Sequence, residues 1–147
     1  MFNVQRVLYA TDFSSYSNQA YFHAIALAER YEATLTILNV WHADADCGSA
    51  EGCRRQLETI RPENAGIPIR HVFLEGDPAT EIVRYANENG VGLIVMGTHG
   101  RTGVERPLMG SVAERVMRDA ACSVLVVKLP KGQPSADRPS AELVGSA

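Results

Sequence analysis

Short apolar segments alternate along the chain with longer segments in which apolar residues recur every three or four positions. The short segments are rich in Val, Ile and Leu, which is typical of buried strands. The sequence predicts strands over residues 4–10, 34–41, 69–75, 92–97 and 123–129. Residues 92–97 form an unbroken apolar run, as expected for a strand that is covered on both faces.

The longer segments have the periodicity of helices that bury one face. The sequence predicts helices over residues 16–32, 50–60, 76–90 and 111–121. Ser14 or Ser15 can cap the first helix, Pro78 lies early in the third, and Gly90 can end it. The least regular part is 42–66, where a helix of only two or three turns is expected.

This alternation of strands and helices predicts an α/β fold. We expect a single-domain three-layer sandwich, in which a five-stranded parallel sheet carries helices on both faces. The domain is expected to span residues 1–130. Residues 131–147 are rich in Pro, Ser, Gly and Ala, and we expect a disordered tail.

Composition narrows the function classes. The chain has 147 residues, of which 46% are hydrophobic and 21% charged, with a formal net charge of -3. This balance predicts no general attraction to nucleic acid or to a membrane surface, and no apolar run has the length of a membrane span. The start of the chain lacks the layout of a signal peptide, so we expect a cytoplasmic protein. We interpret Cys47 and Cys53 as ordinary reduced thiols and Cys122 as a small buried residue.

Glycines gather between the fourth predicted strand and the last predicted helix, at Gly97, Gly100, Gly103 and Gly110. In an open parallel sheet, ligands bind beyond the carboxyl ends of the strands. Glycines there let backbone N–H groups point at a ligand, and the following helix directs its partially positive end to the same place. The alternative is structural, because glycines also permit close packing and S-x-x-E from Ser111 is a capping box.

Other phosphate-binding motifs are absent from the sequence. It contains neither G-x-x-x-x-G-K-[ST] nor G-x-G-x-x-G at this loop, and its only lysines are Lys128 and Lys131. Phosphates would therefore be held by amides, a hydroxyl and a cation, without the charge clamp of fast phosphoryl transfer. His99 can contact a ligand or face solvent, but nothing in the sequence positions a water for it to activate.

The spacing Gly97-x-x-Gly100, nine residues, then Gly110-Ser111 resembles the G-2x-G-9x-G-[ST] signature of the ATP-binding branch of the universal stress protein family. The stretches VLYATDFS, LIVMGTHGRTG and LMGSVAERVMRDAACSVLVVK are also similar to that family, and the resemblance covers residues 3–129. It implies the strand order 3-2-1-4-5. The segment 42–68 is shorter than is usual in the family.

The resemblance also implies a nucleotide site. Its residues here, from the adenosine end to the phosphates, are Thr11, Asp12, Val40, Met96, Gly97, His99, Gly100, Gly110, Ser111 and Val112. Val40 corresponds to the residue whose backbone contacts adenine, and Met96 and Gly97 to the lining of the ribose. The implied ligand is ATP, with ADP or AMP as alternatives, and Mg²⁺ or Mn²⁺ would neutralise the phosphates.

The function implied is that of an ATP-binding stress-response protein, a nucleotide-dependent regulator or interaction module. It would act as a homodimer through residues 123–129 and serve an unknown protein partner. A slow ATPase or adenylate-forming enzyme is one alternative, and an interaction module without nucleotide is another. No catalytic residue is predicted, because the loop has no lysine, no paired carboxylates and no nucleophile with a base.

Overall fold

The computed structural model describes residues 4–43, 48–63, 66–98 and 110–128. Nine elements follow one another within these residues: β1 (Arg6–Ala10), α1 (Ser15–Tyr31), β2 (Thr34–Trp41), α2 (Ala50–Glu58), β3 (Ile69–Glu75), α3 (Pro78–Glu88), β4 (Leu93–Gly97), α4 (Ser111–Asp119) and β5 (Ser123–Val127). All the predicted elements are present, and the sequence-based bounds differ from these by up to two residues.

The five strands form one parallel sheet in the order β3-β2-β1-β4-β5. Both the predicted fold class and the strand order implied by the family resemblance are confirmed. β1 lies at the centre, with β2 on one side and β4 on the other. The first crossover leads from β1 to β2, and the later one from β3 leads back across to β4, so the strand order reverses between β1 and β4.

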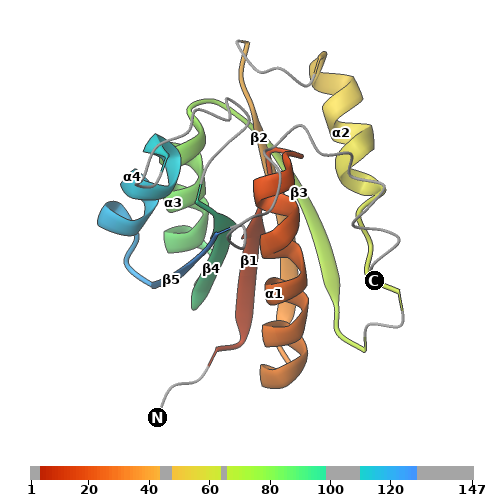
Figure 1. Cartoon of the computed structure of the whole chain (residues 1–147), viewed down its shortest axis with the longest axis vertical. Coiled ribbons are helices and arrows are strands. Elements are labelled where there is room, and N and C mark those ends of the chain that lie inside the picture. Colours follow the sequence, from red (N-terminus) through yellow and green to blue (C-terminus); the bar gives the residue numbers. More distant parts are fainter. Residues whose placement is uncertain (1–3, 44–47, 64–65, 99–109, 129–147) are drawn as a thin grey trace.

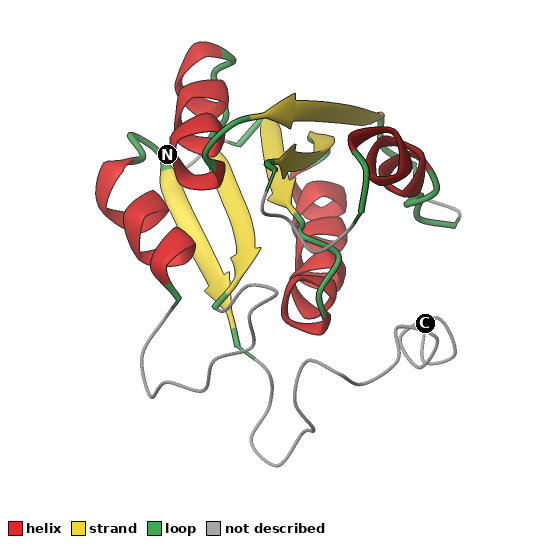
Figure 2. Cartoon of the chain, turned by 90° about the horizontal axis from the view of Figure 1, so that it is seen from above, coloured by secondary structure: helices red, strands yellow, loops and turns green. Residues whose placement is uncertain are grey.

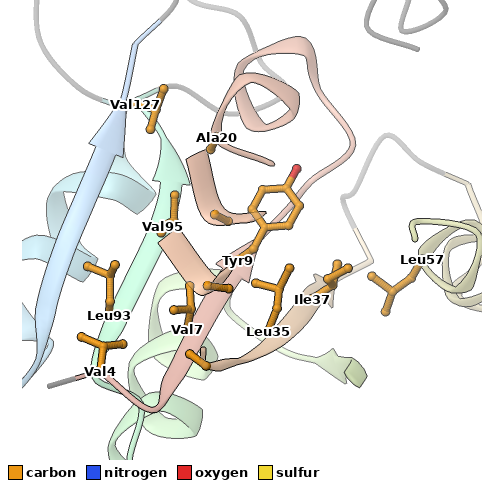
Figure 3. Close-up of a cluster of buried hydrophobic side chains, with 13 residues drawn as sticks. Val4, Val7, Tyr9, Ala20, Leu35, Ile37, Leu57, Leu93, Val95 and Val127 are labelled. Atoms are coloured by element: carbon orange, nitrogen blue, oxygen red, sulfur yellow. The ribbon is translucent and has the colours of Figure 1, made fainter. Parts of the chain in front are cut away.

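Helices cover both faces of the sheet, which makes the three predicted layers (Figure 1 and Figure 2). On one face, α1 and α2 pack on a cluster that includes Tyr9, Leu35, Ile37, Leu57 and Val95. Figure 3 shows Leu57 reaching into this cluster from α2. On the other face, α3 and α4 pack on a second cluster, which is centred on Leu8, Leu38, Ile94 and Val116. The strands are therefore buried on both sides, as the apolar run of β4 predicts.

Local sequence signals account for the helix ends. Ser14 caps α1 by accepting a hydrogen bond from the Ser17 amide, and Asp77 caps α3 in the same way, with proline in the first turn. α3 ends at Asn89, and Gly90 follows with φ of +64°, a left-handed conformation that favours glycine.

Three expectations need correction. Cys53 is fully buried and disulfide-bonded, so the interpretation of Cys53 as a reduced thiol is wrong; Cys47 lies outside the described residues. Cys122 is a free thiol but only partly buried, and this burial raises its pKa. The strand predicted over 123–129 ends at Val127.

The tail 131–147 lies outside the described residues, so the expected disorder there stays a prediction. None of the helices in the described ranges has the combination of length and apolar character that crossing a membrane requires.

Candidate functional site

The candidate site lies at the carboxyl ends of β1 and β4, the two neighbouring strands between which the strand order reverses. Register pairs Tyr9 with Val95, so the residues that follow β1 and β4 emerge side by side. In open α/β sheets this position, beyond the strand ends at a reversal of strand order, is where ligands bind. The topology therefore brings Asp12 and the start of the glycine-rich loop to the same edge.

The chain leaves β1 through a tightly bonded turn. The Ser14 amide donates to Asp12 Oδ1 at 3.0 Å, and the Phe13 amide donates to Thr11 Oγ1 at 2.9 Å. The Thr11 hydroxyl also lies 3.0 Å from Ser17 Oγ in the first turn of α1. Thr11 is buried whereas Asp12 is partly exposed, so the turn offers the Asp12 carboxylate to a ligand.

Three further predicted residues have structural roles in the fold. The side chains of Val40 and Met96 are buried in the cluster beneath α3 and α4, so only their backbones remain for a ligand. Gly97 is in close contact with α1, because a Cβ built on it would lie 2.6 Å from the Tyr16 carbonyl oxygen. The absence of a side chain at Gly97 is therefore explained by packing, a reason the sequence-based prediction of ribose contact did not include.

The amino end of α4 is the second part of the site. Gly110 is its N-cap residue, with Ser111 and Val112 in the first turn, and no side chain caps this helix within the described residues. The predicted capping box is thus wrong, because Ser111 lies one position too far along to serve as N-cap. The Gly110 amide donates to the Thr98 carbonyl at 2.6 Å, which places the start of α4 directly beside the end of β4.

Unlike α4, the helices α1, α2 and α3 each have a side-chain cap. Side-chain oxygens of Ser14, Ser49 and Asp77 each accept a hydrogen bond from the first turn of α1, α2 and α3. A helix leaves its first four N–H groups without intrahelical partners. The first turn of α4, where Ser111 is exposed, therefore combines amide donors, a hydroxyl and the positive end of the helix dipole.

Several candidate residues cannot be placed or are engaged elsewhere. His99, Gly100 and Gly103 lie outside the described residues. Arg115 on α4 donates to Asp77 Oδ2 at 2.8 Å and to Thr80 Oγ1 at 3.0 Å, so it joins α4 to α3. Within the described ranges, no group of three or more His, Cys, Asp or Glu side chains could hold a metal ion.

The histidines of the described elements contact the backbone. His71 on β3 lies with Nε2 2.7 Å from the Ile60 carbonyl oxygen, and His23 lies with Nδ1 3.2 Å from the Gln19 carbonyl oxygen. These contacts indicate a structural role for both side chains.

One residue near the site was missed by sequence reasoning. Asn39 on β2 is 3% exposed, and its Nδ2 donates to the Thr11 carbonyl at 2.9 Å. Its Oδ1 is buried and has no hydrogen-bond partner in the part of the chain that the structure describes. The available signal was an amide side chain inside the apolar run of residues 35–41.

Known proteins are similar to this chain along most of its length. A model of the Universal stress protein family matches residues 3–128. Universal stress protein MJ0531 of Methanocaldococcus jannaschii is 38% identical over 143 residues, which cover 86% of this chain and 84% of that protein. YxiE of Bacillus subtilis is 33% identical, with 87% of this chain and all of that protein covered.

The same relationship is found among solved structures. Protein MJ0577 of Methanocaldococcus jannaschii is similar with a TM-score of 0.78 and 29% identity, over 88% of this chain and 99% of that protein. Because the family model matches most of the sequence and relatives in two organisms match along nearly their full length, the chain belongs to the universal stress protein family.

Proposed function

We propose that this protein binds an adenine nucleotide, ATP in the first instance, at the carboxyl ends of β1 and β4. The observation that carries the proposal is the amino end of α4, which starts at Gly110 without a side-chain cap. Backbone amides at a helix start favour a phosphate, both by hydrogen bonding and by the helix dipole. Ser111 adds an exposed hydroxyl at the same end.

The nucleoside would lie toward the turn after β1. Asp12 is partly exposed there, and its carboxylate can accept a hydrogen bond from a ribose hydroxyl or an amino group. The backbones of Val40 and Met96 reach this edge, while their side chains remain in the core. His99 and Gly100 would complete the phosphate contacts, as the family signature implies.

The donor set of this chain fits such a ligand together with a divalent cation. No lysine lies near the loop, so amides and a hydroxyl supply the polar contacts. A Mg²⁺ or Mn²⁺ ion carried by the phosphates would offset their charge, since hard cations prefer oxygen ligands. ADP or AMP would use the nucleoside contacts and fewer of the phosphate contacts.

In this proposal the protein acts by binding the nucleotide, not by hydrolysing it. In this proposal the nucleotide stabilises a cytoplasmic homodimer through the edge strand β5 and controls contact with a protein partner in a stress response. β5 is apolar and lies at the sheet edge, and such an edge favours pairing with a second copy. Two solved universal stress proteins, one in complex with cAMP and one with AMP bound, share this fold at 24% and 15% identity.

Isothermal titration with Mg²⁺ and ATP tests the proposal directly. We expect the wild-type protein to bind with a stoichiometry of one nucleotide per chain. The Gly110→Val variant should lose binding by about a hundredfold or more, because its side chain would occupy the space of the phosphates and restrict the N-cap backbone.

Gly66→Val is the matched control, because a Cβ at Gly66 meets nothing within 4 Å and that glycine lies far from α4 in the sequence. This control should bind ATP like the wild type. Wild-type protein that gives no heat of binding and no thermal shift with ATP would end the proposal. Equal affinity in Gly110→Val would move the site away from α4.

A further inference from the structure

We propose that Asn39 is a positioning residue of the nucleotide site, which holds the Thr11 carbonyl and thereby sets the direction of the Asp12 carboxylate. This inference rests on the proposed function and assigns a role to a residue outside the family signature. Asn39 does not belong to the exposed part of the site, since it is 3% exposed and acts through the backbone.

Asn39 holds the Thr11 carbonyl through a buried hydrogen bond. Asn39 lies on β2, next to the end of β1, and its Nδ2 donates to the Thr11 carbonyl oxygen at 2.9 Å, in a buried environment. The Thr11 amide meanwhile donates to the Leu38 carbonyl at 2.9 Å. Thr11 is thus attached to β2 through both its amide and its carbonyl, immediately before the chain turns at Asp12.

The turn that follows Thr11 contains an unfavourable backbone conformation. Phe13 has φ of +68°, a left-handed conformation that is uncommon and unfavourable for a residue with a bulky side chain. Such a conformation persists only where the surroundings hold it. The amides of Phe13 and Ser14 donate to Thr11 Oγ1 and Asp12 Oδ1, respectively. The Phe13 side chain packs on the hydrophobic cluster between the sheet and the helices α1 and α2.

An asparagine at position 39 has an energetic cost. Oδ1 of Asn39 is buried and has no hydrogen-bond partner within the described ranges. Burying an amide with one oxygen unsatisfied is unfavourable, and a leucine of similar size would avoid that penalty. The hydrogen bond that Asn39 donates to the Thr11 carbonyl offsets this cost. By holding Thr11, it gives the carboxylate of Asp12 a defined orientation.

A positioning role and a purely structural role predict opposite results for Asn39→Leu. The substitution removes the unsatisfied oxygen but leaves the Thr11 carbonyl without its donor, so the two effects on stability offset each other. We expect a thermal midpoint within about 2 °C of the wild type. ATP affinity, measured by titration at 20 °C below that midpoint, should fall by about tenfold.

The matched control is Thr36→Val. Thr36 is also buried and polar on β2, but it pairs with Leu8, away from the turn. Its substitution should leave ATP affinity unchanged. Asn39→Ser is a second variant, which keeps a polar group too short to reach Thr11 and should lose affinity like Asn39→Leu.

A double-mutant cycle shows whether Asn39 acts through Asp12. Asp12→Asn keeps an oxygen for the Ser14 amide but removes the carboxylate charge. If Asn39 acts by orienting that carboxylate, Asn39→Leu should change ATP affinity by about twofold or less in the Asp12→Asn background.

The outcomes separate the two proposals. Absence of ATP binding by the wild type ends the proposed function and this inference with it. Wild-type binding together with unchanged affinity in Asn39→Leu and Asn39→Ser overturns this inference alone. A tenfold loss that persists in full in the Asp12→Asn background also overturns it, because the effect would then not pass through Asp12.

Discussion

Gly97 offers a quantitative test of how β4 and α1 fit together. A Cβ at this position would lie 2.6 Å from the Tyr16 carbonyl oxygen, 2.7 Å from the Tyr16 carbonyl carbon and 3.1 Å from the Ser17 amide nitrogen. All three are backbone atoms in the first turn of α1, so no side chain can rotate away. Gly97→Ala must therefore push the helix and the strand apart.

The size of the effect follows from these distances. Reaching an ordinary contact of 3.4 Å requires a separation of about 0.8 Å between two elements that are otherwise closely packed. Overpacking of this kind costs about 1 to 3 kcal/mol. A domain of this length loses about 3 °C for each kcal/mol, so the thermal midpoint should fall by about 3 to 9 °C.

The assay is thermal and urea unfolding of the nucleotide-free protein, followed by circular dichroism. Gly92→Ala is the control, because a Cβ there meets Val4 at 3.5 Å, an ordinary contact. The control should be neutral or slightly stabilising, since alanine restricts the unfolded chain more than glycine does. If Gly97→Ala is as stable as Gly92→Ala, the close approach of β4 to α1 is not what excludes a side chain at Gly97.

Two further predictions concern charge and thiols. Hydrogen bonds from Thr80, and to a smaller extent from Arg115, hold the pKa of Asp77 below its ordinary value of 3.8. The Asp77 carboxylate therefore stabilises the folded state above pH 3.8, and this stabilisation is lost as the pH falls through the folded-state pKa. Urea midpoints of wild type and Asp77→Asn should therefore differ at pH 6, and the difference should shrink as the pH falls below 3.8. The second test is iodoacetamide labelling of the native protein without reductant, followed by mass spectrometry. Cys122 should be labelled slowly, because burial raises its pKa, and Cys53 should stay unlabelled. Labelling of Cys53 in the unreduced protein would contradict its disulfide.

Much of the fold could be predicted from the sequence because the relevant signals are local. The first N-cap was predicted as Ser14 or Ser15, and the structure has Ser14; this cap and the proline in the first turn of α3 depend only on residues within one helical turn. The apolar run of β4 indicates burial on both faces for a similar reason, since it depends only on the side chains of that strand.

Local signals were less reliable at the site. The S-x-x-E pattern at Ser111 predicted a capping box, but α4 has Gly110 as its N-cap, a difference of one residue that changes which groups are left for a ligand. The sequence could not decide whether Gly110 or Ser111 is the N-cap residue, because both start positions satisfy the helical periodicity. The Gly110 amide donates to the Thr98 carbonyl, a contact between residues that are not neighbours in the sequence.

The sequence by itself thus determined the succession of strands and helices along the chain and the faces they bury, and it predicted the sheet edge at which a ligand would bind. Only the tertiary structure decided why Gly97 has no side chain, that Asn39 holds Thr11, and that Arg115 joins Asp77. Asn39 and Thr11 are 28 positions apart in the sequence, and Gly97 and Tyr16 are 81 positions apart. These contacts depend on sheet register and helix packing, which arise from the whole chain and leave no periodic pattern in any one segment.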